Sequence, residues 1–131
     1  MKIVVNGTFD ILHRGHIELL EHARSLGEHL LVLIDTDSRV TELKGSTRPI
    51  NNQSDRAYML QSLQCVDAVW TFNSEEELEN ILEMYQPDIM VKGSDYQGKR
   101  IVGAQYCKEI KFVDLVSGYS TTNIIQRITD R

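Results

Sequence analysis

The sequence contains little cysteine and no long apolar run. Its two cysteines, Cys65 and Cys107, are widely spaced in 131 residues. They fit no disulfide framework, metal motif or redox motif, so we expect two reduced thiols. No apolar stretch approaches the roughly 20 residues that a membrane span needs. Met1 to Val5 passes directly into a motif without a cationic region or a cleavage site, so we expect a cytoplasmic protein with no membrane partner.

Net positive charge is lacking as well. With 14 Lys and Arg against 19 Asp and Glu, the formal net charge is −5. This balance argues against a general nucleic-acid binder, which needs a basic face for its phosphate contacts. It leaves open an anionic small molecule, provided that a few basic side chains and backbone N–H groups converge on one site.

What the sequence does have is a regular alternation of strand-like and helix-like segments. Apolar or β-branched runs predict strands at 2–5, 30–34, 67–72, 88–92 and 110–115. Helical spacing and caps predict helices at 15–26, 52–63 and 74–85, a short helical stretch after Gly103, and a last helix capped by Ser120 or Thr121. This alternation predicts one α/β domain over residues 1–131, with a five-stranded parallel sheet and helices on both faces. Ligands of such folds bind beyond the carboxyl ends of the strands.

Residues 35–52 interrupt the alternation. The segment is polar and contains Gly45 and Pro49, so we expect an irregular loop. A loop of about 18 residues is long for a compact domain, and loops of that length are usually functional or mobile.

The first chemically informative block is residues 7–16, GTFDILHRGH, between the first strand and the first helix. Gly7 permits close backbone approach, so the N–H groups of Thr8 and Phe9 can point at a phosphate. The helix that begins near Gly15 or His16 adds its positive N-terminal end. Gly15 leaves no side chain between His13 and His16, so both imidazoles can donate to one anion.

Other interpretations of the histidine pair exist. A His-x-x-His pair can hold a metal ion, but no Cys, Glu or third His nearby completes a site. Histidines without a role on the surface are the usual case elsewhere, and we interpret His22 and His29 in that way.

A second block, residues 119–125 (YSTTNII), opens the last helix. Hydroxyl groups at a helix N-terminus add donors to the N–H groups of the helix itself, which suits a triphosphate. A simple N-cap role for Ser120 or Thr121 is the alternative.

The two blocks together resemble the signature of the cytidylyltransferase-like branch of the HxGH nucleotidyltransferase superfamily. This resemblance implies a Rossmann-like domain in which His13 and His16 contact the triphosphate and its transition state. It also implies that Gly7, Thr8, Phe9 and Gly15 bind the nucleotide, together with Ser120, Thr121 and Thr122. Asp10 is expected near the acceptor substrate or the bound metal.

The long loop supplies two further cations. By the same resemblance, Lys44 binds the phosphates as a catalytic residue and Arg48 assists in substrate binding. Arg56 stands where the family often has an Arg at the site or at a dimer interface, with a surface role as the alternative. The resemblance also implies a homodimer.

A third block, residues 91–96 (VKGSDY), closely resembles the adenylyltransferase domain of the bifunctional ADP-heptose synthase. It places Lys92 and Gly93 at the nucleotide and Asp95 at the substrate. The competing branch, glycerol-3-phosphate cytidylyltransferase, has an Arg that reads cytosine where this chain has Leu115. An apolar side chain cannot donate to the cytosine carbonyl, and loss of such a contact lowers selectivity by roughly 10⁴-fold, so ATP is favoured over CTP.

The expected reaction is transfer of a nucleotidyl group, AMP from ATP, to a sugar 1-phosphate such as a heptose 1-phosphate, with release of pyrophosphate. We expect Mg²⁺ to be bound through the triphosphate, with no metal-binding side chains. CTP:glycerol-3-phosphate cytidylyl transfer, a nucleotide-binding module without turnover, and a metal-dependent hydrolase remain alternatives. Two features depart from the heptose enzyme: we expect this domain to stand alone, whereas that enzyme usually fuses a kinase domain to it, and Tyr119 replaces a smaller residue. Either departure leaves another acceptor sugar phosphate as an alternative.

Overall fold

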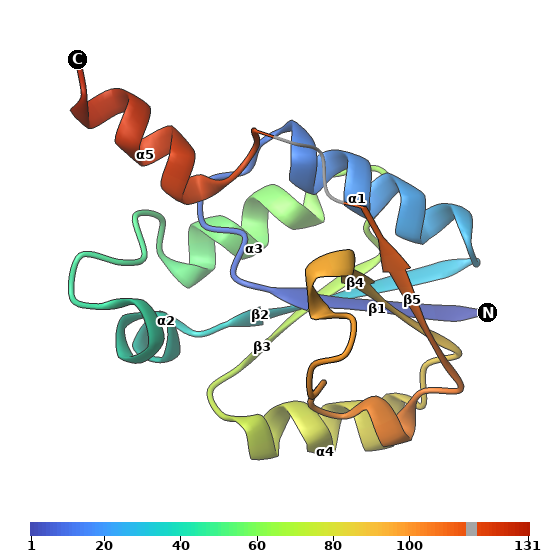
Figure 1. Cartoon of the computed structure of the whole chain (residues 1–131). Helices are drawn as coiled ribbons and strands as arrows, with labels where there is room; N and C mark the ends of the chain where they lie inside the picture. Colours follow the sequence, from blue (N-terminus) through green and yellow to red (C-terminus); the bar gives the residue numbers. More distant parts are fainter. Residues whose placement is uncertain (115–117) are drawn as a thin grey trace.

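Five strands form a single parallel sheet in the computed structural model, which describes residues 1–114 and 118–131 (Figure 1). The strands are β1 (Lys2–Gly7), β2 (His29–Asp35), β3 (Ala68–Phe72), β4 (Ile89–Gly93) and β5 (Glu109–Val113). Their order is β3-β2-β1-β4-β5, and every neighbouring pair is parallel. The predicted five-stranded parallel sheet is therefore confirmed.

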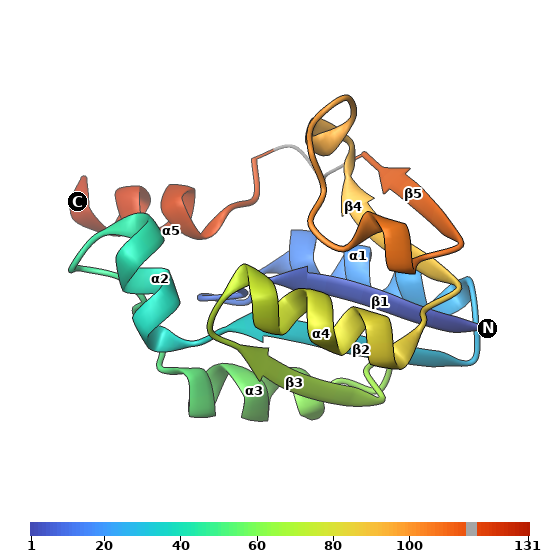
Figure 2. The ribbon, with the colours of Figure 1, turned by 90° about the horizontal axis from the view of Figure 1, so that it is seen from below.

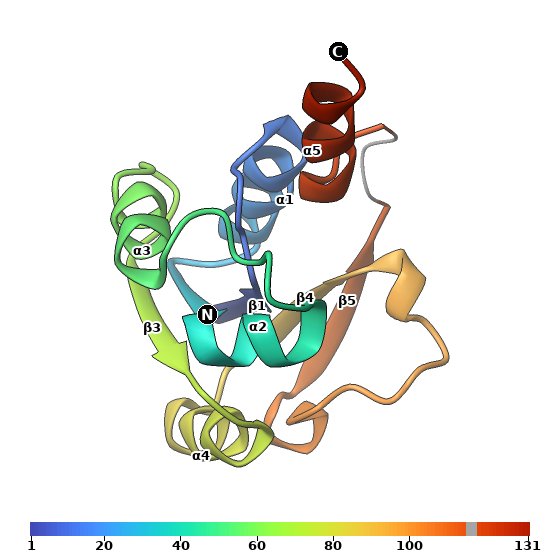
Figure 3. The same ribbon diagram turned by 90° about the vertical axis from the view of Figure 1, so that its left-hand side faces the viewer.

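Helices cover both faces of the sheet, also as predicted. Figures 1 and 3 show α1 (Arg14–Ser25) and α3 (Gln53–Gln61) on one face and α4 (Glu75–Tyr85) on the other. Each strand packs against the helices on both faces of the sheet because successive side chains point to opposite faces. In β1, Ile3 belongs to the core under α1 and α3, whereas Val4 belongs to the core under α4.

The expectation of an irregular loop over residues 35–52 is wrong in its first half, where α2 (Asp37–Lys44) forms. Thr36 caps this helix by accepting a hydrogen bond from the Arg39 N–H. Val40 is the only buried residue of α2, so no apolar stripe could reveal the helix in the sequence. The helix is held by its cap and by polar contacts at the end of the sheet.

The remaining boundaries differ by small amounts. α1 begins at Arg14, and the polar segment after β4 contains the short 3-10 helix η1 (Ser94–Tyr96), while η2 (Ala104–Tyr106) accounts for the expected helical stretch. The last strand is described only to Val113, and Leu115, on which the cytosine argument rested, lies outside the described residues.

The carboxyl ends of the central strands lie at the same end of the fold as two helices. Strand order reverses between β1 and β4, and the carboxyl ends of these strands flank the crevice in which open α/β sheets bind ligands. Figure 2 shows α2 and the last helix, α5 (Thr121–Thr129), at this end of the sheet. Within the described part of the chain, no helix is long and apolar enough to cross a membrane.

Candidate active site

A cavity of about 530 Å³ lies at the carboxyl ends of the strands. Most of the predicted site residues line it: Gly7, Thr8, Phe9, Asp10, His13, Gly15, His16, Lys44, Arg48, Lys92, Ser120, Thr121 and Thr122. The other two, Gly93 and Asp95, line a neighbouring pocket of about 200 Å³ that shares His16 and Lys92 with the first. Residues separated by more than 100 positions in the sequence therefore meet at one site.

The two histidines cap the first helix and fix each other's orientation. His13 is the N-cap of α1, and its Nδ1 accepts the N–H of His16 at 3.4 Å. In return, Nδ1 of His16 accepts the N–H of His13 at 3.4 Å. Because both Nδ1 atoms act as acceptors, the proton of each neutral ring is on Nε2. Each ring therefore offers one Nε2–H donor.

Both imidazoles are neutral at pH 7. Burial, followed by the neighbouring His13 and Lys44, lowers the pKa of His16 to about 4. Burial also lowers the pKa of His13. The rings stack with centroids 3.7 Å apart, a separation that disfavours two positive charges. In the free protein the pair thus acts as two hydrogen-bond donors rather than two cations.

Small residues and aromatic rings hold the histidine pair in place. A Cβ on Gly15 would approach the His13 ring to 3.0 Å and Tyr119 Cβ to 3.1 Å, so a larger residue would displace the ring. Phe9 packs against His16 and Tyr119 against His13, with centroid distances of 4.9 and 6.1 Å. Phe9 has a φ of 51°, and this unusual backbone conformation is typical of functional turns.

The N-terminus of α5 is tied to the turn that follows β1. The Thr121 hydroxyl lies 3.3 Å from both N and O of Ile11. Ser120 is the N-cap, and its Oγ accepts the N–H of Asn123 at 2.9 Å. Ser120 thus has the N-cap role that we considered, and it also lines the cavity.

The helix ends that face the cavity differ from a helix end that does not. The first turns of α1 and α5 contain no acidic residue, whereas α4 carries Glu75, Glu76 and Glu77 in its first turn. Carboxylates in the first turn neutralise the positive end of a helix. The N-termini of α1 and α5 therefore keep their positive potential and their unpaired N–H groups for an anion.

Cations concentrate at this site despite the net charge of the chain. The basic residues that line the cavity are Arg39, Lys44, Arg48, Lys92 and Arg100, against the acidic residues Asp10 and Asp35. Burial, then Arg48, lowers the pKa of Lys44, and burial lowers the pKa of Lys92, whose Nζ lies 4.6 Å from the Tyr96 ring centroid. Lys92, which is half-buried, thus stands in a partly dehydrated site where its charge acts strongly on an anion, whereas Lys44 is more exposed.

Asp10 holds the segment that carries Arg48. Its buried carboxylate accepts hydrogen bonds from the N–H groups of Ile50 and Asn51 at 2.8–3.0 Å and from Arg48 Nε at 3.1 Å. Burial alone raises the pKa of Asp10, but these hydrogen bonds outweigh it and lower the pKa below the ordinary value. The carboxylate positions Arg48 at the cavity.

Arg56 is buried, so the alternative of a surface role is wrong. The residue is 1% exposed, and its side chain donates to Thr8 O, Asn51 O and Asp37 Oδ1 at 2.9–3.0 Å. It therefore ties the turn after β1, the segment before α3 and the start of α2 together. His29 likewise is not an isolated surface residue, because its Nδ1 lies 2.7 Å from the Tyr85 hydroxyl.

Sequence reasoning missed one side of the cavity. Asp35 and Arg39 lie there as an ion pair of 2.9 Å, beside Phe72. Asn6 is also present, and its Oδ1 is buried without a hydrogen-bond partner among the described residues. A polar residue directly after a buried strand, as Asp35 is after Leu30–Ile34, is a signal that could have been used. No comparable signal in the sequence pointed to Arg39, because α2 itself was not predicted.

A metal site made of protein side chains is not found in the described ranges. Across residues 1–114 and 118–131, no three His, Cys, Asp or Glu side chains are grouped so that they could hold an ion.

A comparison with protein families identifies the family of this chain. The cytidylyltransferase-like family matches residues 4–127. The chain belongs to this family. The match covers nearly all of the described sheet and helices, and it confirms the resemblance seen in the motifs.

Curated relatives named "Bifunctional protein HldE" are similar over nearly the whole chain. The protein from Campylobacter fetus subsp. fetus (strain 82-40) is 49% identical over 126 residues, and that from Aliarcobacter butzleri (strain RM4018) is 51% identical over 130 residues. These alignments cover 96% and 98% of this chain but 27% of each relative. The chain thus spans about a quarter of the length of these relatives.

Solved structures agree on the fold. The lipopolysaccharide core biosynthesis protein from Thermoplasma volcanium has a TM-score of 0.69 and 25% identity, covering 87% of this chain and 97% of that protein. The pantothenate synthetase from Thermus thermophilus has a TM-score of 0.58 at 16% identity, covering 95% and 63%, a likeness of fold alone.

Proposed function

We propose that the chain transfers AMP from ATP to a heptose 1-phosphate, forming a nucleotide-sugar and pyrophosphate. One observation carries the proposal: the histidines of the first block, the hydroxyl block of α5, Lys44 and Lys92 all line a single cavity. The similarity to bifunctional HldE proteins, which are ADP-heptose synthases, supports the same reaction.

The triphosphate binds to helix N-termini, hydroxyl groups and lysines that already line the cavity. The N-termini of α1 and α5 meet the phosphate oxygens with N–H groups and with the hydroxyls of Ser120, Thr121 and Thr122. Lys44 and Lys92 supply charge from two other elements. Phosphoryl chemistry asks a protein mainly for such positioning and for stabilisation of developing charge.

Transfer itself needs no general base, because the acceptor phosphate oxygen is already anionic. This oxygen attacks the α-phosphorus in line, and the bond to the departing pyrophosphate breaks. His13 and His16 donate Nε2–H to the oxygens on which charge develops, an arrangement that their capping contacts fix in advance.

Mg²⁺ fits this site as an ion carried by the phosphates. The two carboxylates at the cavity, Asp10 and Asp35, already accept from arginine and other donors within 3.1 Å. When bound to the triphosphate, the ion neutralises part of its charge. The protein residues then orient the complex through Lys44, Lys92 and the two helix ends.

The assembly state is a separate part of the proposal. By family resemblance we propose a homodimer, and a molar mass of twice 15.0 kDa in light scattering would support it.

The test is pyrophosphate release measured over a matrix of nucleotides and acceptors. ATP and CTP are each combined with heptose 1-phosphate, other sugar 1-phosphates and glycerol 3-phosphate. We expect turnover with ATP and heptose 1-phosphate, and much lower rates elsewhere. Faster turnover with CTP and glycerol 3-phosphate would assign the competing cytidylyl reaction. Nucleotide binding with no turnover for any pair would indicate a binding module instead.

A further inference from the structure

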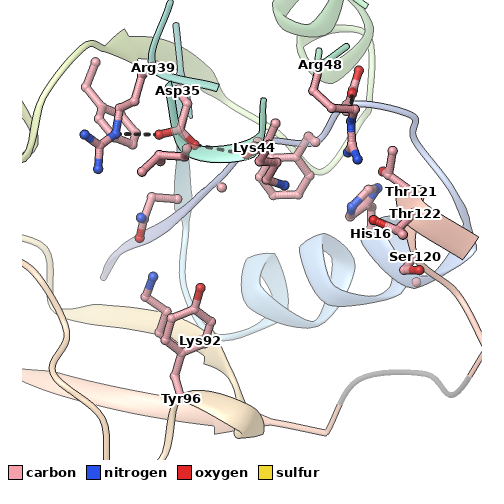
Figure 4. A pocket seen from close by; sticks show the side chains of 18 of the residues that line it. His16, Asp35, Arg39, Lys44, Arg48, Lys92, Tyr96, Ser120, Thr121 and Thr122 are labelled. Carbon is pink, nitrogen blue, oxygen red and sulfur yellow. Dashed lines mark hydrogen bonds and ion pairs between the residues drawn. The ribbon is translucent and has the colours of Figure 1, made fainter. Parts of the chain in front are cut away.

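The cavity has a second side that the triphosphate does not use. Figure 4 shows His16 and Ser120–Thr122 on one side of the pocket and Asp35 with Arg39 on the other, with Lys44 between them and Lys92 beside Tyr96 across the cavity from Asp35. The motif residues account for the first side. The second side needs a different occupant.

Arg39, on this second side, is held by an ion pair and an aromatic contact that occupy only part of its guanidinium group. Its Nε donates to Asp35 Oδ1 at 2.9 Å, and its Cζ lies 5.6 Å from the Phe72 ring centroid. The Arg39 side chain is only 18% exposed. A guanidinium has five N–H donors, yet among the residues that the structure describes its two terminal amino groups have no hydrogen-bond partner. These groups are available to a ligand.

Acceptors are available beside these donors. Asp35 accepts from Thr8 Oγ1 at 3.1 Å and from Arg39, and a carboxylate has about four lone-pair positions. Asn6 adds a buried Oδ1 without a described partner. Asn6 lies two residues after Val4 in β1, so it points to the same face of the sheet, the face that carries Phe72 and Leu78.

The combination selects a chemical class of ligand. Asp35 and Arg39 together are electrically neutral, so the pair does not attract an anion as Lys44 and Lys92 do. An ionised phosphate accepts hydrogen bonds but cannot donate to the Asn6 or Asp35 oxygens, whereas a hydroxyl group does both. Phe72 and Leu78 add an apolar wall that suits the C–H face of a sugar ring.

We propose that Asp35 and Arg39 read the hydroxyl groups of a sugar phosphate acceptor, whose phosphate lies toward Lys44 and Lys92. This assignment rests on the proposed transfer reaction and specifies how its acceptor is chosen. It makes Arg39 a specificity-determining residue and gives α2 a function in recognition.

Direct binding tests this assignment without turnover. Arg39→Met keeps the length and the contact with Phe72 but removes the donors. Calorimetric titrations use heptose 1-phosphate and, separately, inorganic phosphate, both with α,β-methylene-ATP and Mg²⁺ present. We expect the variant to bind heptose 1-phosphate about 10- to 100-fold more weakly, the usual effect of losing a charged hydrogen bond. Its affinity for inorganic phosphate and for the ATP analogue should stay within about twofold of wild type.

A matched control is available at the opposite end of the sheet. Arg24 pairs with Asp67 at 3.0 Å, outside both pockets. Arg24→Met removes an Arg–Asp pair of the same kind, and we expect it to leave all three affinities unchanged. If Arg39→Met fails to fold, Arg39→Lys, which keeps the charge but loses the planar fork, is measured in the same way with the same expected selectivity.

Several outcomes overturn the assignment. An equal loss of inorganic phosphate affinity in the Arg39 variant would make Arg39 a phosphate anchor. Unchanged heptose 1-phosphate affinity, or a wild-type protein that prefers inorganic phosphate, would remove sugar recognition altogether. The proposed reaction fails separately: a wild-type protein that binds heptose 1-phosphate through Arg39 but releases no pyrophosphate keeps this assignment and loses the reaction.

Discussion

The two sides of the cavity are built in different ways. The side that we propose for the triphosphate, here called the triphosphate side, comes from two short contiguous segments, residues 7–16 and 119–122, each at a helix N-terminus. The side that we propose for the sugar comes from single residues of separate elements: Asn6, Asp35, Arg39, Phe72 and Leu78. Backbone N–H groups of a helix end recognise phosphate whatever the rest of the ligand is. Recognition of an individual acceptor depends on scattered side chains, which can change one at a time.

The largest expected effect follows from removing an Nε2–H donor on the triphosphate side. His16→Ala should lower kcat by about 10²- to 10³-fold, the usual effect of losing one preorganised donor. The KM of the acceptor should change little, since His16 lies on the other side of the cavity. Steady-state pyrophosphate release measures both, with His22→Ala, an exposed histidine, as the control. Near-normal turnover in a folded His16→Ala protein would refute the role of His16.

Arg56 connects the two sides, so its loss should affect both through stability. Arg56→Met leaves the carbonyls of Thr8 and Asn51 unpaired in the interior. We expect the free energy of unfolding to fall by about 2–4 kcal/mol in urea denaturation. Arg14→Met, which removes an exposed ion pair with Glu18, should change it by less than about 0.5 kcal/mol. Equal effects of the two variants would contradict the role of Arg56 in holding these segments together.

The pH dependence of kcat/KM distinguishes neutral from cationic histidines. The pKa of His16 is about 4 in the free protein, so the ring is neutral throughout the neutral and mildly alkaline range. Between about pH 7.5 and 8.5 both substrates' phosphates are ionised, and kcat/KM should be flat. A requirement for an imidazolium would instead lower kcat/KM about tenfold per pH unit. Such a slope would show that at least one of the two imidazole rings must be positively charged for the reaction.

A smaller effect on stability than that of Arg56 is expected for Asp10, whose carboxylate accepts a hydrogen bond from Arg48. Its pKa is lowered on folding, so its contribution is present above the unfolded pKa of about 3.9 and is lost as the pH falls through the lower folded value. Asp10→Asn should lower the free energy of unfolding by about 1–2 kcal/mol at pH 7. The difference from wild type should narrow below about pH 4. A difference that is independent of pH would mean that the negative charge of Asp10 is unimportant.

The fold was largely predictable because its signals are local. Continuous apolar runs such as Leu30–Ile34 can be buried on both faces only as strands of a covered parallel sheet. Ser74 capping α4 and Pro87 after it mark the helix boundaries. α2 was missed for the opposite reason. It buries only Val40 and is stabilised by its cap and by tertiary polar contacts, which leave no periodic trace in the sequence.

The site likewise contains residues that local sequence predicts and residues that it does not. The sequence alone predicted the groups that we propose to bind phosphate, because a glycine turn, a histidine pair and a hydroxyl-rich helix start are each made from neighbouring residues. Only the tertiary structure decided that Arg39 is clamped between Asp35 and Phe72, and that Arg56 is buried under the turn after β1. These contacts join residues from separate elements, and their partners are set by strand order and helix packing rather than by spacing along the chain.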